Sequence, residues 1–368
     1  MKQTDFALTA FILLLAALPA SAHHVLAAKF DMSKSTRLEG SVTKVDWTNP
    51  HVHVFIDVKD AKGVLTNWAI ELESVVDLER SGWSVTTVKP GDVLAVDGNI
   101  AKNGTHQIWG NAVSAAGKKI FAVTPATQPV ATGKPAPRWP DGQIRLGAEP
   151  GKTGYWAFPT AVSLVETGVN IQMDRNGVLK NTGDAAKVAP FQPWARDLYV
   201  LRQKNNLETD PTYLTCLPPG VPRMFLSPYG IQLLENKERQ RVFVVMGGAN
   251  RNWRLLYLDG RNNVGQRQGD DDNPLYYGRS VGKWEGDTLV IEVKGFNEKF
   301  WFSNGGLPHT QQLQLTEKYT RTDFDTLKYE VTVDDPGAYT RTWTAASWTM
   351  KWVPDQDPPE YFCQDNRP

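Results

Sequence analysis

The stretch LQLTEKYTRTDFDTLKYEVTVDDPGAYTRTWTAASWTMKWV, residues 313–353, decides the fold class of the larger part of the chain. Apolar and polar residues alternate over much of its length, which is the period of a half-buried β-strand. Two groups of turn-forming residues, Asp323-Phe324-Asp325 and Asp334-Asp335-Pro336-Gly337, divide it into three long strands. Consecutive strands joined by short turns pair antiparallel, so the stretch predicts a β-meander.

The sequence before this meander continues the same pattern. GRSVGKWEGDTLVIEVKGF, residues 278–296, predicts two strands around a Glu285-Gly286-Asp287 turn, and 241–248 with 253–261 predicts another pair. Residues 144–368 are therefore expected to form a large antiparallel β-barrel of the lipocalin type. A barrel of about eight strands can enclose one small ligand.

Residues 35 to about 121 predict a second, smaller β-structure. Three alternating segments, 38–47, 51–60 and 67–73, precede VVDLERSGW, residues 75–83, which predicts a helix that ends at Gly82. Two or three further strands follow, separated by Pro90-Gly91, Asp97-Gly98 and Asn103-Gly104. Five or six strands with one helix partway along predict a small OB-like barrel within a module of residues 23–121.

Two further segments complete the expected organisation of this mainly β protein. Residues 122–143, rich in Pro, Ala and Thr, predict an extended linker between the modules. Residues 1–22 predict a signal peptide, with Lys2 before an apolar run and a cleavage site after Ala22. The mature protein is therefore expected to be periplasmic or secreted.

Charge and cysteine content narrow the function classes. Lys plus Arg equals Asp plus Glu, 40 each, which gives no electrostatic argument for binding nucleic acid or an anionic membrane. No other segment is long and apolar enough to predict membrane insertion. Cys216 and Cys363 are predicted to form a disulfide in an oxidising compartment, stabilising the fold by about 5 kcal/mol in the chain-entropy model. The oligomeric state is not indicated.

Four of the six histidines lie early in the chain: His23, His24, His51 and His53. Residues two apart on a strand share a face, so His51 and His53 point the same way. Cleavage after Ala22 would make His23 the N-terminus, whose amine and ring nitrogen can both bind one metal ion. With His24 and His51 this predicts a nitrogen-rich copper or zinc site. The alternative interpretation is a structural histidine cluster.

Two segments resemble families of secreted bacterial proteins of unknown function. AHHVLAAKFD, VTKVDWTNPHVHVFIDVKD and NWAIELES, within residues 20–121, resemble a domain family with the pattern Ala-His-His, Trp-x-Asn-Pro-His and Trp-x-x-Glu. That pattern corresponds to His23, His24, Trp47, Asn49, Pro50, His51, Trp68 and Glu71, and His53 lies outside it. CLPPGVPR, SVGKWEGDTLVIEVKGFN, LTEKYTR and VTVDDPGAYTRTWT, within 138–363, resemble a second such family. Neither resemblance implies a reaction.

The second module offers one candidate catalytic histidine. His309 follows a glycine-containing loop, and histidine is the commonest proton shuttle near neutral pH. We expect it to act with carboxylates Glu285 and Asp287 and with Arg254. The predicted reaction is acid–base chemistry without an organic cofactor, namely elimination, isomerisation or hydrolysis, as in a lyase, isomerase or hydrolase.

The expected substrate is a small apolar or aromatic molecule held in the large barrel. Nine of the thirteen tryptophans follow residue 130, and tryptophan lines ligand pockets as well as filling cores. Trp284, Trp301, Arg223 and Tyr339 are the candidate ligand-binding residues. The alternative function is a non-catalytic periplasmic protein that binds copper or zinc and a ligand.

Overall fold

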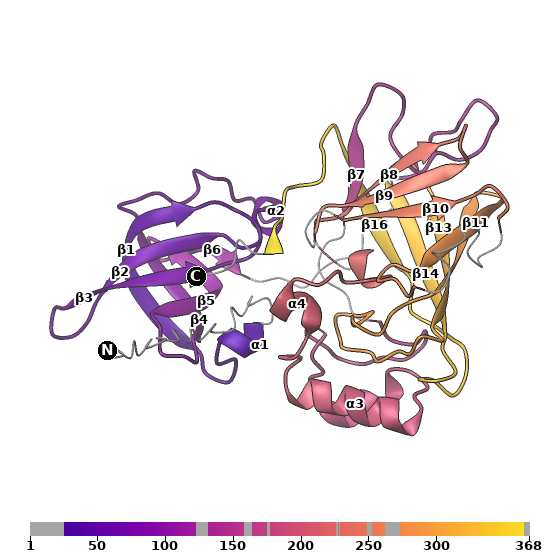
Figure 1. Cartoon of the computed structure of the whole chain (residues 1–368). Helices are drawn as coiled ribbons and strands as arrows, with labels where there is room; N and C mark the ends of the chain where they lie inside the picture. The colour runs from indigo at the N-terminus through magenta and orange to yellow at the C-terminus, as the bar shows by residue number, and fades with distance from the viewer. Residues whose placement is uncertain are drawn as a thin grey trace, which may run out of the picture.

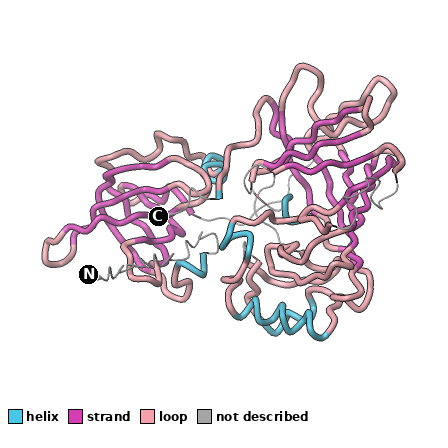
Figure 2. The backbone as a smooth tube through the Cα atoms, in the orientation of Figure 1, coloured by secondary structure: helices cyan, strands magenta, loops and turns pink. Residues whose placement is uncertain are grey.

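Two β-barrels make up the described part of the computed structural model. It describes residues 26–122, 132–157, 164–174, 177–225, 227, 229–248, 252–261 and 273–363. The two barrels form separate lobes, with the N-terminal lobe coloured indigo to purple and the C-terminal lobe magenta to yellow (Figure 1). The tube view shows that strands dominate both lobes and that most helices lie near the space between the lobes or below the larger one (Figure 2). The mainly β class predicted from the sequence is confirmed.

The small lobe contains six strands and two short helices. In chain order these are α1 (Leu26–Lys29), β1 (Thr36–Asp46), β2 (His53–Lys59), β3 (Leu65–Glu71), α2 (Val75–Arg80), β4 (Val93–Ile100), β5 (Gln107–Ala115) and β6 (Lys118–Ala122). Pairing runs β3-β2-β1-β4-β5-β6, and a parallel β3–β5 contact closes the first five strands into a barrel. One helix, α2, lies between β3 and β4 as expected, which gives the predicted OB-like barrel.

Alternation along the strands explains the small core. Val52, Val54 and Ile56 are buried inside the barrel, while His51 and His53 are only partly buried and face the other way. The helix α2 ends where expected, since Gly82 adopts φ +86° directly after it. The helix α1 packs onto the barrel separately, because Leu26 and Phe30 cluster with Ala101 and Trp109.

The large lobe contains the remaining elements. They are β7 (Gly154–Ala157), η1 (Thr182–Lys187), α3 (Pro193–Lys204), α4 (Pro211–Thr215), η2 (Arg223–Phe225), β8 (Ile231–Asn236), β9 (Arg241–Met246), β10 (Trp253–Tyr257), β11 (Arg279–Glu285), β12 (Thr288–Lys294), β13 (Gln314–Arg321), β14 (Thr326–Asp334), β15 (Trp343–Thr344) and β16 (Trp348–Pro354). None of the described helices has the length and apolar character that a membrane crossing requires.

The large barrel closes with nine strands. Its order is β13-β12-β11-β10-β9-β8-β7-β16-β14, and β14 returns to pair with β13, while β15 adds to the outside of β14. The predicted large β-barrel is thus confirmed, and it has nine strands where about eight were expected. One pairing departs from the antiparallel expectation, because β10 and β11 run parallel at Leu256–Ser280 and Tyr257–Val281.

Side chains occupy much of the interior of the large barrel. Along β13 the inward residues are Leu315, Glu317, Tyr319 and Arg321, all buried. The η2 turn contributes Phe225, whose ring lies 5.8 Å from Tyr319 and 4.9 Å from Tyr329. This part of the barrel is therefore a packed core with buried charges in it.

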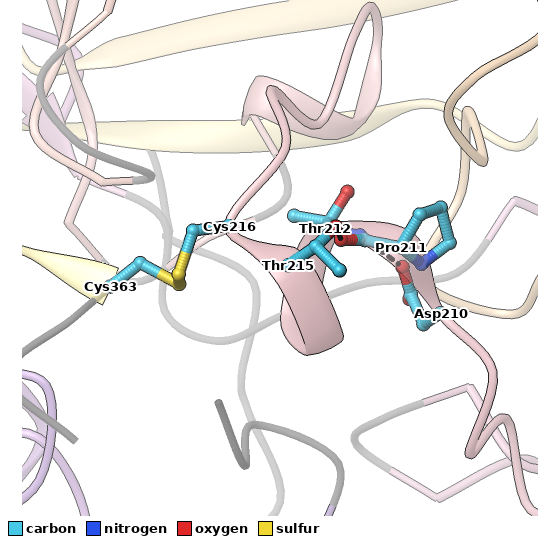
Figure 3. Close-up of a disulfide and its surroundings, with 6 residues drawn as sticks. All are labelled: Asp210, Pro211, Thr212, Thr215, Cys216 and Cys363. Atoms are coloured by element: carbon cyan, nitrogen blue, oxygen red, sulfur yellow. Dashed lines mark hydrogen bonds between the residues drawn. A yellow bond between two sulfur atoms is a disulfide. The ribbon is translucent and has the colours of Figure 1, made fainter. Parts of the chain in front are cut away.

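A disulfide and the chain end connect the lobes. Cys216 follows α4 and forms a disulfide with Cys363 near the C-terminus, as predicted (Figure 3). Asp210 caps the start of α4 by accepting from the backbone N–H of Thr212. Val76 of the small lobe, Tyr229 and Tyr361 pack around Cys363 in one apolar cluster. The part of the predicted linker that is described also has fixed contacts, because the Lys134 carbonyl accepts from Phe324 N and Arg138 pairs with Asp287.

Candidate functional site

A buried carboxylate at the end of β3 is the centre of a polar cluster on the small barrel. Glu71 is directly opposite His53 in the β2–β3 register, and its side chain is only 2% exposed. One carboxylate oxygen lies 2.5 Å from Nδ1 of His51, and the other lies 2.8 Å from Nζ of Lys29. His53 Nε2 lies 3.7 Å from the same oxygen as Lys29. Three side chains from two segments of the chain thus converge on one carboxylate.

Electrostatics keep this carboxylate ionised. Burial by itself raises the pKa of Glu71, but hydrogen bonds from His51 and His53 and the charge of Lys29 hold that pKa well below its ordinary value. A buried carboxylate needs such partners, because an unpaired charge inside a protein is very costly. Glu71 is therefore an anionic anchor for the imidazole of His51 at neutral pH.

The anchor fixes the orientation of the His51 ring. A neutral imidazole that donates from Nδ1 to a carboxylate carries its lone pair on Nε2, which is the form that binds metals or accepts protons. The ring also lies edge-on to Trp109, with centroids 5.3 Å apart. The side chain of His51 is 15% exposed. Carboxylate, imidazole and indole together hold the ring in one place while leaving part of it accessible.

The preceding residues attach this cluster to the large lobe. Asn49 Nδ2 donates to the backbone carbonyl of Glu360 at 3.1 Å, and its Oδ1 accepts from Val75 N at 3.1 Å. Tyr229 OH donates to the carbonyl of Pro50 at 3.0 Å. The Trp-x-Asn-Pro-His stretch therefore contacts the second module through Asn49 and Pro50 and places His51 beside Glu71.

Of the predicted metal ligands, the structure describes one. His51 is in the cluster above, whereas His23 and His24 lie outside the described residues. Among the residues that are described, no three His, Cys, Asp or Glu side chains form a group that could hold a metal ion. The metal prediction thus stays a prediction.

The candidate histidine of the large lobe is packed inside it. His309 is 8% exposed; its Nε2 lies 3.0 Å from the Phe300 carbonyl and its Nδ1 3.2 Å from the Thr310 carbonyl. Phe300 and Phe302 flank the ring at 4.5 and 5.7 Å. Burial lowers the pKa of His309, although both carbonyls favour its charged form. The ring thus contacts main chain and aromatic side chains.

The other predicted catalytic residues lie in different parts of the barrel. Glu285 and Asp287 flank the exposed β11–β12 turn and pair with Lys283 and Arg138. Arg254 is buried in the barrel, where it pairs with Glu317 and donates to Ser280 Oγ at 2.9 Å. None of the described contacts joins His309 to these three residues.

The predicted ligand-binding residues fall into two groups. Trp284 is half-buried on β11 and packs against the core. Trp301 belongs to the loop of residues 300–309, and Arg223 and Tyr339 contact that loop. Arg223 bonds Asp210 and the Trp301 carbonyl, and Tyr339 OH donates to the Pro308 carbonyl at 2.8 Å. Trp301 lies under the Arg202 guanidinium at 4.3 Å. Arg223 and Tyr339 therefore each bond a backbone carbonyl of the loop that contains Trp301 and His309.

Sequence reasoning did not select Lys29 or Glu71 as site residues. The usable signal was the β2–β3 pairing, which puts a carboxylate opposite His53 on the face away from Val52 and Val54. Lys29 had no such signal, because its contact with Glu71 joins residues 42 positions apart.

Comparison with known proteins finds a family match over the N-terminal part of the chain. A family model described as "Family of unknown function (DUF6152)" matches residues 11–109. That range includes His51 and Glu71, and it ends before the large barrel begins. No curated protein matches the chain.

Proposed function

We propose that the protein is an extracytoplasmic metal-binding protein, with a copper or zinc centre on the small barrel built around His51. The observation that carries the proposal is the 2.5 Å contact between His51 Nδ1 and the buried carboxylate of Glu71. Metal-binding histidines almost always donate the N–H of their second ring nitrogen to a carboxylate, a backbone carbonyl or water. His51 therefore has the orientation of a ligand.

The neighbourhood supplies further nitrogen donors. His53 lies on the same face of β2 and is 25% exposed. His23 and His24 precede Leu26 by three and two residues in the sequence. Leu26 itself is packed onto the barrel. Imidazoles with a terminal amine form a nitrogen-rich set, which suits copper(II) and then zinc.

Charge compensation supports the role of Glu71 as an orienting residue. Lys29 neutralises one carboxylate oxygen while His51 bonds the other. The carboxylate can thus hold the imidazole without itself binding the ion, as outer carboxylates do in histidine–metal sites.

The test is titration of the exported, metal-free protein with copper(II) and zinc(II) by calorimetry. We expect one ion per chain, loss of this binding in His51→Ala, and an affinity about 10–100-fold weaker in Glu71→Gln. His106→Ala is the matched control, because His106 is exposed and its ring packs against Trp68, with centroids 5.1 Å apart. A form with one extra residue before His23 tests whether the terminal amine of His23 is a metal ligand, because that amine is then replaced by a peptide bond. Equal, sub-stoichiometric metal in all five proteins, the wild type included, would refute the centre.

Acid–base chemistry is a second candidate for the same histidine. The specific observation in its favour is the ionised, buried Glu71 that orients His51, the arrangement of a general base and its supporting carboxylate. It needs no metal. Turnover of a small molecule that persists with a chelator and disappears in His51→Ala would favour this candidate over the metal centre. His309 has less geometric support, because carbonyl groups lie against both of its ring nitrogens.

A further inference from the structure

A pocket of about 190 Å³ lies at one end of the large barrel. Four segments form it: the chain before the first strand of the barrel, at Lys134 and Pro137; residues 147–153; the β13–β14 turn; and the end of β16. Its walls include Phe324 and Trp352, two flat apolar side chains. The volume is below the roughly 300–1,000 Å³ of pockets for drug-sized ligands, so it suits a smaller molecule.

Arg321 is the buried charged residue of this pocket. Its neighbours in the lining that carry charge, Lys134, Glu149, Lys152 and Asp355, are all exposed. Those two lysines and two carboxylates balance one another within the lining, and the guanidinium adds one buried positive charge to it. Burial lowers the pKa of Arg321 to about 10, which leaves it cationic at neutral pH.

The partners of this guanidinium are neutral. Nη1 donates to the carbonyls of Arg145 and Gly147 at 2.9 and 3.1 Å, and Nε donates to that of Phe324 at 3.2 Å. Nη2 also donates to the Phe324 carbonyl, which uses one of its two hydrogens. Arg321 makes no ion pair with any described carboxylate; Glu235, Glu149, Asp323 and Asp325 act on it from longer range.

The two buried arginines among the predicted site residues, in contrast, each have a direct carboxylate partner. Arg223 pairs with Asp210 and Arg254 with Glu317, both inside the protein. A buried cation without a direct counter-ion is expensive, and an anionic ligand would supply what the protein does not. The tryptophan rings near Arg321, Trp156 at 4.8 Å and Trp352 at 5.1 Å, hold the group in place.

We propose that the Arg321 pocket binds a small organic monocarboxylate with a flat, apolar body. The carboxylate accepts from Nη2 of Arg321, and the body lies against Phe324 and Trp352. This site is separate from the histidine cluster of the small barrel, and its occupancy does not depend on metal.

The experiment uses benzoate as the probe and benzamide, its neutral isostere, as the comparison. Calorimetry on the full-length mature protein should show saturable binding of benzoate and at least about tenfold weaker binding of benzamide, because a charge-assisted hydrogen bond to arginine is lost. Arg321→Gln should abolish the preference for the anion. Equal affinities for the two probes, or no saturable binding of benzoate, would overturn the proposal.

A second variant covers the case in which Arg321→Gln does not fold. Ala148→Phe fills the pocket without removing a polar side chain, and Ala346→Phe, at an exposed loop position, is its matched control. Benzoate binding should be lost in the first and unchanged in the second. Benzoate affinity that survives in Ala148→Phe would show that the ligand lies elsewhere and would refute the assignment.

Discussion

The buried charge of Glu71 gives the small barrel a defined response to acid. Because its folded pKa lies well below its ordinary value of about 4.3, the unfolded chain takes up a proton at a higher pH than the folded chain does. The stability that Glu71 contributes is therefore complete above that ordinary value. It is lost as the pH falls toward the folded pKa.

We predict that Glu71→Gln lowers the free energy of unfolding of the small barrel by about 3–5 kcal/mol at pH 7, because it breaks a buried ion pair. The difference from wild type should shrink at pH 3, below the ordinary pKa of a glutamate, because the unfolded chain is then protonated at this position and the ionised Glu71 of the folded chain contributes less stability. Urea unfolding followed through amide resonances of β2 and β3 measures both values. A difference that stays constant between pH 7 and pH 3 would contradict this linkage.

Arg254 provides a second residue-level test, now of the large barrel. The guanidinium and Glu317 are both buried, and the hydroxyls of Tyr319 and Tyr329 also donate to Glu317. Arg254→Met should cost about 3–5 kcal/mol, since it leaves an unpaired buried carboxylate. Arg138→Met removes the exposed pair with Asp287 and should cost at most about 1 kcal/mol. Equal effects in thermal and urea unfolding would contradict the structural assignment of Arg254.

At the scale of elements, the cap of α2 can be tested directly. Ser74 is buried, its Oγ accepts from the backbone N–H of Asp77 at 3.1 Å and donates to the Asp77 carboxylate at 2.7 Å. Ser74→Ala should therefore destabilise the small barrel by about 0.5–2 kcal/mol. Ser84→Ala, in an exposed turn, is the control. Hydrogen exchange of α2 amides would report the loss, and unchanged exchange would contradict it.

The elements that the sequence predicted well are those with local signals. Alternation and turn residues together locate the β11–β12 and β13–β14 hairpins, and both pair in register. The strand β7 has four buried residues and no alternation, so nothing in its sequence separates it from a core loop. The parallel β10–β11 pairing joins segments across a connection whose course is set by the whole barrel.

The site was less predictable than the fold, for a physical reason. Glu71, the partner of His51, is 20 residues away in the sequence, and Lys29, the partner of Glu71 on α1, is 42 residues from it. Spacing within a strand says which residues share a face, but long-range packing decides which face meets which helix. For His309 the sequence signal pointed to a site, because the residue follows a glycine-containing loop. In the structure, however, Phe300 and Phe302 pack against its ring.

At the scale of the whole molecule, a small set of contacts joins the two barrels. Tyr229 donates to the Pro50 carbonyl and packs against Tyr361 with ring centroids 4.7 Å apart, and Asn49 donates to the Glu360 carbonyl. The last two contacts need the C-terminal segment in place. Cys363 links that segment covalently to Cys216. The disulfide therefore helps to keep the contacts of Glu360 and Tyr361 in place, and Asn49, which bonds Glu360, is close in sequence to His51.

We therefore predict that Cys216→Ser with Cys363→Ser affects both stability and shape. The cross-link spans 147 residues, so in the chain-entropy model its loss costs about 5 kcal/mol of unfolding free energy. Release of residues 360 and 361 should also loosen the barrels, which small-angle X-ray scattering would detect as a larger radius of gyration at a temperature where both remain folded. Lys102→Gln, which removes the exposed pair with Glu208 between the same two barrels, should leave the scattering unchanged. If the double variant scatters like the wild type, the contacts of Asn49 and Tyr229 hold the junction without help from the disulfide.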